Sequence, residues 1–167
     1  MNLRLFVPLL LAAGCRGSGD IDSMLGTWEG TLDCVSDVDA GGQTVRLEYS
    51  IDLLLILDEQ DEKRYSGTLD TFAAYLWDAR EIREETAYSV GLLQARPQGD
   101  QPVELRDAAC AAYAVYVDDE SAGGVCDAAD ARDNEPVASE PPSGELRWDG
   151  ADTITVTGEF CDGTILR

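Results

Sequence analysis

The chain has 167 residues, with 12 basic and 33 acidic side chains and a formal net charge of −21 at pH 7. Hydrophobic residues make up 44% of it, which suffices for the core of one ordinary domain and argues against global disorder. The strong negative charge argues against nucleic acid as a partner and against adsorption to anionic lipid headgroups. The chain contains no histidine, which excludes Ser-His-Asp and Cys-His catalysis. We therefore expect no enzymatic activity and no cofactor.

The first fifteen residues have the layout of an export signal. Arg4 gives a positive start, Leu5 to Ala13 form an apolar run, and Gly14 then precedes Cys15. This apolar run is too short to cross a bilayer, because a helix of that length rises about 14 Å against a hydrocarbon core of roughly 30 Å. The alternative to an anchoring signal is a cleaved signal of a soluble secreted protein, in which Cys15 is incidental.

The segment resembles the lipobox signal of bacterial lipoproteins, which ends at the lipidated cysteine. The resemblance implies cleavage after Gly14 and attachment of acyl chains to Cys15, which would make membrane lipid its partner. Two or three chains anchor stably, because each buried methylene contributes about 0.8 kcal/mol. Arg16 stands where an aspartate would imply the inner membrane, so the resemblance implies the cell envelope with the outer membrane favoured. We expect residues 1–14 to be a cleaved signal peptide and residues 15–24 a lipidated tether.

Residues 25–167 are expected to form a single β domain, because apolar side chains alternate with polar ones along much of this segment. The clearest run extends from Val45 to Leu57, where the apolar residues share one parity, and at this length we expect a bend or bulge. The pattern predicts about eight short strands in a mainly β antiparallel barrel or sandwich. The other alternating runs are Leu25–Gly30, Tyr65–Leu69, Tyr88–Leu92, Val103–Leu105, Ala111–Val117, Leu146–Trp148 and Ile154–Phe160.

One segment between these runs is ambiguous. Phe72 to Glu85 fits a short amphipathic helix, with Phe72, Leu76 and Ile82 on its apolar face, and it fits an extended segment nearly as well. We therefore expect at most one short helix beside the sheet.

A second segment, Asp118 to Gly144, is acidic and rich in small residues and proline, which predicts a long exposed loop. Its run from Asp127 to Glu135 offers carboxylates for calcium, but the ligand spacing of an EF-hand is missing and Arg132 lies inside the run. We therefore expect a solvated loop and no metal site, with a calcium-dependent binding module as an alternative.

Four cysteines follow Cys15, and an even number in an exported chain predicts two disulfides. A zinc site would need close cysteine pairs or histidines, and the chain has neither. Four cysteines can form two disulfides in three different ways. We favour Cys110–Cys126, which would close a local hairpin centred on Asp118.

This choice leaves Cys34–Cys161, which would join the first strand to the last. Directly opposed residues of a sheet point to the same side, whereas the alternation places Cys34 on an apolar face and Cys161 on a polar one. The pairing therefore needs a bulge near Gly158.

The opening Gly26-Thr27-Trp28 resembles the Gly-x-Trp motif of lipocalins. In that family an arginine near the last strand packs over the tryptophan, and Arg167 is the matching residue here, because pairing Cys34 with Cys161 brings residue 28 opposite residue 167. The alternative is a tryptophan that fills the end of any β core. The resemblance implies a barrel that holds a small apolar ligand near Trp28, with Trp148 on the same wall.

The sequence thus predicts a lipid-anchored, disulfide-stapled, mainly β envelope protein that acts as a non-catalytic structural or interaction module, with a protein partner in the envelope. A lipocalin-like carrier of a small apolar ligand is the first alternative. An open apolar cavity behind Trp28 would favour the carrier, and a solid core would favour the interaction module.

Overall fold

A computed structural model describes residues 23–40, 42–94, 101–132, 135–138 and 144–167. All regular elements in these residues are β-strands. They are β1 (Gly26–Ala40), β2 (Gln43–Asp61), β3 (Arg64–Trp77), β4 (Arg80–Gln94), β5 (Gln101–Val117), β6 (Glu120–Gly123), β7 (Glu145–Trp148), β8 (Thr153–Thr157) and β9 (Cys161–Leu166). No helix long and apolar enough to cross a membrane occurs in the described part of the chain. The predicted signal peptide and Cys15 lie outside the described residues.

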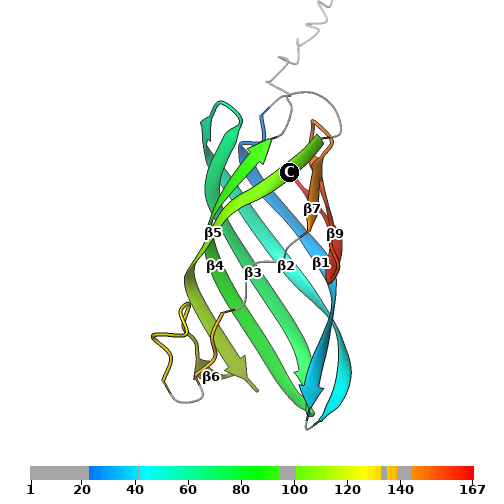
Figure 1. The fold of residues 1–167 in the computed structure, drawn as a ribbon, viewed down its shortest axis with the longest axis vertical. Coiled ribbons are helices and arrows are strands. Elements are labelled where there is room, and N and C mark those ends of the chain that lie inside the picture. Colours follow the sequence, from blue (N-terminus) through cyan, green and yellow to red (C-terminus); the bar gives the residue numbers. More distant parts are fainter. Residues whose placement is uncertain (1–22, 41, 95–100, 133–134, 139–143) are drawn as a thin grey trace, which may run out of the picture.

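The strands form one antiparallel sheet that closes into a barrel (Figure 1). β1 to β5 follow one another as a meander, and β7, β8 and β9 continue it until β9 pairs with β1. β5 pairs with β4 along most of its length, with β7 at its N-terminal end and with β6 at its C-terminal end. β6 is thus an appendage of β5, and the remaining eight strands close the ring. A mainly β antiparallel architecture is confirmed.

The first five strands are longer than predicted, and β5 merges two runs that the sequence separates. Its register against β4 shifts twice, between Ala87 and Tyr88 and between Gly91 and Leu92. Each shift inserts an extra β5 residue and reverses the parity of the side chains that follow. β2 also carries the expected irregularity, a register shift just after Leu57.

The short helix considered for Phe72–Glu85 is wrong. These residues end β3 and begin β4, joined by Asp78 and Ala79 with φ of 50° and 63°. Two successive positive φ angles give the tight turn whose twist matches a hairpin. Phe72 and Leu76 face outward and are 37% and 70% exposed, so they form no apolar face of a helix.

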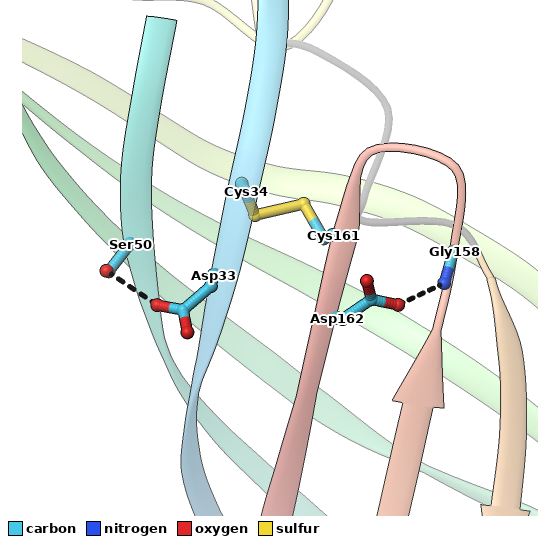
Figure 2. The surroundings of a disulfide bond; sticks show 6 residues. All are labelled: Asp33, Cys34, Ser50, Gly158, Cys161 and Asp162. Carbon is cyan, nitrogen blue, oxygen red and sulfur yellow. Dashed lines mark hydrogen bonds between the residues drawn. A yellow bond between two sulfur atoms is a disulfide. The ribbon is translucent and has the colours of Figure 1, made fainter.

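Both predicted disulfides are present. Cys34 and Cys161 are directly opposed on β1 and β9, with their Cα atoms 4.1 Å apart (Figure 2). The bulge expected near Gly158 is wrong: residues 158–160 form the turn between β8 and β9, held by the Gly158 amide, which donates to Asp162 Oδ1 over 3.1 Å. A turn resets the side-chain parity, so both cysteines point into the core, 2% and 6% exposed.

The Cys110–Cys126 bond joins β5 to the segment that follows β6. It lies across the β5–β6 hairpin, whose turn residues Asp118 and Asp119 have φ of 50° and 67°. The Asp118 carboxylate accepts from Arg80 Nε and from the Glu81 amide, each over 2.9 Å. The Arg80 hydrogen bond, followed by that of the Glu81 amide, lowers the pKa of Asp118, and these contacts fix the β5–β6 turn beside the β3–β4 turn.

The core occupies the part of the barrel that β7, β8 and β9 close. Met24 is fully buried there, although the sequence places it in the tether, and its carbonyl accepts from Trp28 Nε1 over 2.8 Å. The largest fully buried side chains are Trp28, Trp148, Tyr65, Met24, Leu32, Leu57 and Ile154.

Candidate binding face

The ring of strands is complete along only part of its length. β9 pairs with β1 from Glu29 to Cys34, so the β1 edge at residues 36–40 has no pairing with β9. On β5, the edge away from β4 pairs with β7 at residues 101–103 and with β6 from Val115, and no described strand pairs with it in between. The long strands extend past the ends of β7, β8 and β9 (Figure 1). One half of the barrel is therefore closed, and the inner face of the other half lies between an edge of β1 and an edge of β5 that no described strand joins to each other.

We call this second part the open half. It comprises residues 36–40 of β1, 43–49 of β2, 73–77 of β3, 80–86 of β4 and 108–117 of β5.

The closed half is filled by its own side chains. Its interior retains a void of ≈ 50 Å³ walled by Met24 and by aliphatic side chains such as Leu53 and Ile154. Ligand sites for small molecules occupy roughly 300–1,000 Å³, so this void is too small for a fatty acid or a similar ligand. Neither Trp28 nor Trp148, the two candidate ligand contacts, lines it.

The two tryptophans lie instead at the end of the closed half, beside the C-terminus. The Arg167 guanidinium lies 4.5 Å from the Trp28 ring centroid, which confirms the predicted contact. Arg167 also donates to the carbonyl of Ala151 over 3.0 Å, and Trp148 Nε1 donates to the same carbonyl over 3.2 Å. These contacts connect the two tryptophans, through Arg167 and the Ala151 carbonyl, at the end of the barrel.

The inner face of the open half carries a carboxylate surrounded by tyrosines. Glu84 is the one carboxylate of the described strands with a buried cross-strand partner on each side, Ala73 on β3 and Val115 on β5. Opposed residues share a face, so Glu84 points inward. The Tyr75 hydroxyl donates to Glu84 Oε1 over 2.6 Å.

Two further tyrosines complete the cluster. The rings of Tyr49 and Tyr75 have centroids 5.6 Å apart and planes inclined by 51°, so they form a corner. Tyr113, opposite Thr86, lies diagonally across from Glu84 on the β5 side. Four neighbouring strands thus each contribute one side chain to what we call the Glu84 cluster: Tyr49, Tyr75, Glu84 and Tyr113.

Burial and the Glu84 charge keep the tyrosines of this cluster protonated. Desolvation, followed by the Glu84 carboxylate, raises the pKa of Tyr113 to about 12 and raises that of Tyr49. Desolvation and the hydrogen bond to Glu84 raise the pKa of Tyr75 further. Arg83, the neighbouring cation, pairs with Glu85 and Asp119, and no described lysine or arginine forms an ion pair with Glu84.

The acidic loop flanks this cluster. Backbone at Gly124 packs on Tyr113, since a Cβ added there would lie 3.0 Å from the Tyr113 ring. Asp127 Oδ1 accepts from the Ala129 amide over 2.8 Å, a contact that closes a loop turn. Among the described residues there is no group of three or more histidine, cysteine, aspartate or glutamate side chains that could hold a metal ion. Residues 133–134 of the predicted calcium run lie outside the described part.

The outer face carries a separate, shallow groove of ≈ 830 Å³ across β1 to β5. Acidic side chains and the exposed Phe72 line it, and among them is Glu85, the neighbour of Glu84 on the opposite face of β4. The two glutamates therefore provide a matched pair, one inside the barrel and one outside.

Sequence reasoning missed the Glu84 cluster. A signal was present, because Glu84 shares parity with Thr86, Tyr88 and Val90, which are all buried. Glu84 lies within a run of charged residues that is typical of a solvated surface, so the sequence did not single it out as inward-facing.

No family model matches the chain, and neither does any curated protein or solved structure.

Proposed function

We propose that the protein is a non-catalytic interaction module, held at the bacterial envelope by lipid on Cys15, which binds its partner on the inner face of the open half. The observation that supports this proposal is the contrast between the closed half and the open half of the barrel. The closed half is a filled scaffold with a void of ≈ 50 Å³, whereas the open half presents partly exposed apolar and aromatic side chains. Exposed concave apolar faces with a polar group are typical of binding sites.

The chemistry of the open half supports binding over catalysis. Carboxylate-based hydrolysis needs two carboxylates on the two sides of the reacting bond. Glu84 accepts a hydrogen bond from a tyrosine hydroxyl. Glu120 on β6 shares this face, because it lies opposite Val117, but it is exposed at the β5–β6 turn. A single carboxylate between neutral phenols fits recognition of a charged group.

A lipocalin-like carrier remains the second candidate, and the Arg167 contact with Trp28 favours it. The small void weighs against a ligand in the closed half. Titration of the delipidated protein with fatty acids separates the two candidates. The interaction module predicts no saturable change in tryptophan fluorescence and no rise in melting temperature, whereas a carrier shows both.

The binding face can be tested by photo-crosslinking in intact cells. A photoreactive residue at Leu47, on the inner face of the open half, should give protein adducts. The same residue at Leu76, which is 70% exposed on the outer face, is the matched control and should give none. Equal adducts at both positions, or adducts at Leu76 alone, would contradict the proposed face.

The anchor is tested by Cys15→Ser. This variant should leave the membrane fraction, and a radioactive fatty acid should label the original protein but not the variant. A protein that is soluble and unlabelled with Cys15 intact would show that the lipid anchor is wrong.

A further inference from the structure

We infer that the Glu84 cluster is a binding site for an organic ammonium group, with the Glu84 carboxylate as counter-ion and the rings of Tyr75 and Tyr113 as its walls. The inference deepens the proposed function and rests on it, because it assigns a ligand class to the inner face of the open half.

The geometry places a negative charge between aromatic rings. Glu84 lies on β4, with Tyr75 on the neighbouring β3 and Tyr113 on the neighbouring β5. The Tyr75 hydroxyl holds one carboxylate oxygen over 2.6 Å, and the inclined ring of Tyr49 extends the wall behind it. Tyrosine rings attract cations through their faces, and a carboxylate beside them adds direct charge attraction.

The charge of Glu84 is uncompensated within the described part of the chain. The side chain is partly buried, its buried cross-strand partners are Ala73 and Val115, and no lysine or arginine forms an ion pair with it. A partly buried charge is costly unless an opposite charge or several donors stabilise it. One hydroxyl donor leaves most of the acceptor capacity of the carboxylate open for a cationic ligand.

The donor set favours an organic cation over a metal ion. Calcium takes six to eight oxygen ligands and magnesium needs near-octahedral oxygen coordination. The cluster supplies one carboxylate, and the raised pKa of Tyr75 and Tyr113 keeps their hydroxyls neutral, which makes them weak metal ligands. Large, weakly hydrated ammonium groups instead bind well to aromatic walls.

The surroundings favour any cation that approaches. The net charge is −21, and the Cys110–Cys126 bond holds the acidic loop beside Tyr113. A field of one sign over a concave face raises the local concentration of counter-ions. We therefore expect binding to weaken as salt rises.

Isothermal titration calorimetry on the protein extracted from the envelope in non-ionic detergent tests the inference. Choline and tetramethylammonium should bind saturably. The neutral isostere of choline, in which a tert-butyl group replaces trimethylammonium, should show at least about tenfold weaker binding. Equal binding of the neutral isostere would mean an apolar pocket without charge recognition and would overturn the inference.

Glu84→Gln keeps the size of the side chain and an acceptor for Tyr75, so it should fold and lose at least about tenfold in choline affinity. Glu85→Gln removes the same charge on the outer face and should bind choline like the original protein. Equal losses in both variants would reduce the effect to net charge and would contradict the site.

Tyr113→Phe keeps the ring and should retain binding, whereas Tyr113→Leu removes one wall and should weaken it by roughly tenfold. Circular dichroism and the melting temperature identify a variant that has lost its fold. The choline affinities of the variants that remain folded then test the inference. No saturable binding to the folded original protein would overturn the inference outright.

Vesicle sedimentation of the Cys15→Ser variant, which has no acyl chains of its own to insert into a bilayer, separates the two sources of an ammonium group. Cosedimentation with phosphatidylcholine but not phosphatidylglycerol vesicles, abolished by Glu84→Gln, identifies a lipid headgroup, whereas binding of free choline alone identifies a small molecule. Adducts at Leu47 without choline binding would refute this inference and leave the interaction module standing. The absence of adducts at Leu47 together with the absence of choline binding would refute the binding face and the ammonium site.

Discussion

The guanidinium of Arg167 lies over the ring of Trp28, with its central carbon 4.5 Å from the ring centroid. The same group donates to the carbonyl of Ser23 over 2.7 Å and to that of Ala151 over 3.0 Å. A single side chain at the end of the chain thereby joins the entry to β1, the β1 strand itself and the β7–β8 turn.

We expect Arg167→Ala to lower the free energy of unfolding by about 1–2 kcal/mol, because it removes a cation–π contact and two charge-assisted hydrogen bonds. Urea unfolding followed by tryptophan fluorescence measures the change. Arg46→Ala is the control: its ion pair with Glu48 spans 3.5 Å between exposed side chains and should contribute at most about 0.5 kcal/mol. Equal effects of the two substitutions would contradict a structural role for Arg167.

The two disulfides should differ in their contribution to stability. Replacing both Cys34 and Cys161 by alanine frees a loop with a sequence separation of 127 and should cost about 5 kcal/mol. The same change at Cys110 and Cys126, with a separation of 16, should cost about 3 kcal/mol. Chemical unfolding of the two double variants ranks them. The reverse order would mean that the unfolded chain is already ordered around the first pair.

Gly67 is required by close approach of two backbones. A Cβ added there would lie 1.8 Å from the carbonyl oxygen of Ile56, where β2 is irregular. Gly67→Ala should therefore cost about 3 kcal/mol or prevent folding. Gly91→Ala is the matched strand control, because its nearest neighbour is the Asp107 side chain at 3.3 Å, which can move. Melting temperatures should fall strongly for the first variant and by a few degrees at most for the second.

Alkaline pH should destabilise the protein through the Glu84 cluster. An unfolded tyrosine loses its proton near pH 10, whereas folded Tyr113 holds it until a pKa of about 12. The folded state thus binds more protons in this window, so stability is full below pH 10 and falls as pH rises towards 12. Urea midpoints measured across the window should fall less steeply in Tyr113→Phe. An unchanged slope in this variant would show that Tyr113 titrates normally.

Features that depend on local order along the chain can be predicted from the amino-acid sequence. A period of two in apolar residues predicts strands wherever one face is buried, and this held from Val45 to Leu57. The Cys110–Cys126 bond can be predicted because the two cysteines flank a short hairpin. Once they are paired, Cys161 is the remaining partner for Cys34. That pairing then places Arg167 opposite Trp28, because antiparallel register extends along the strands.

The position of the candidate site depends on the pairing between strands, which the sequence pattern does not reveal. Two bulges in β5 each reverse side-chain parity and together cancel, so Tyr113 keeps the inward parity of Val103. Cys110 lies between the bulges and faces inward against this parity, and sequence alternation cannot locate such insertions. Glu84 stands in a run of charges, and it meets Tyr75 across the β3–β4 hairpin. Tyr49 and Tyr113 join them only through the register of β2 against β3 and of β5 against β4. Whether the barrel is filled or hollow depends on the summed volume of side chains from all strands, which no local pattern encodes.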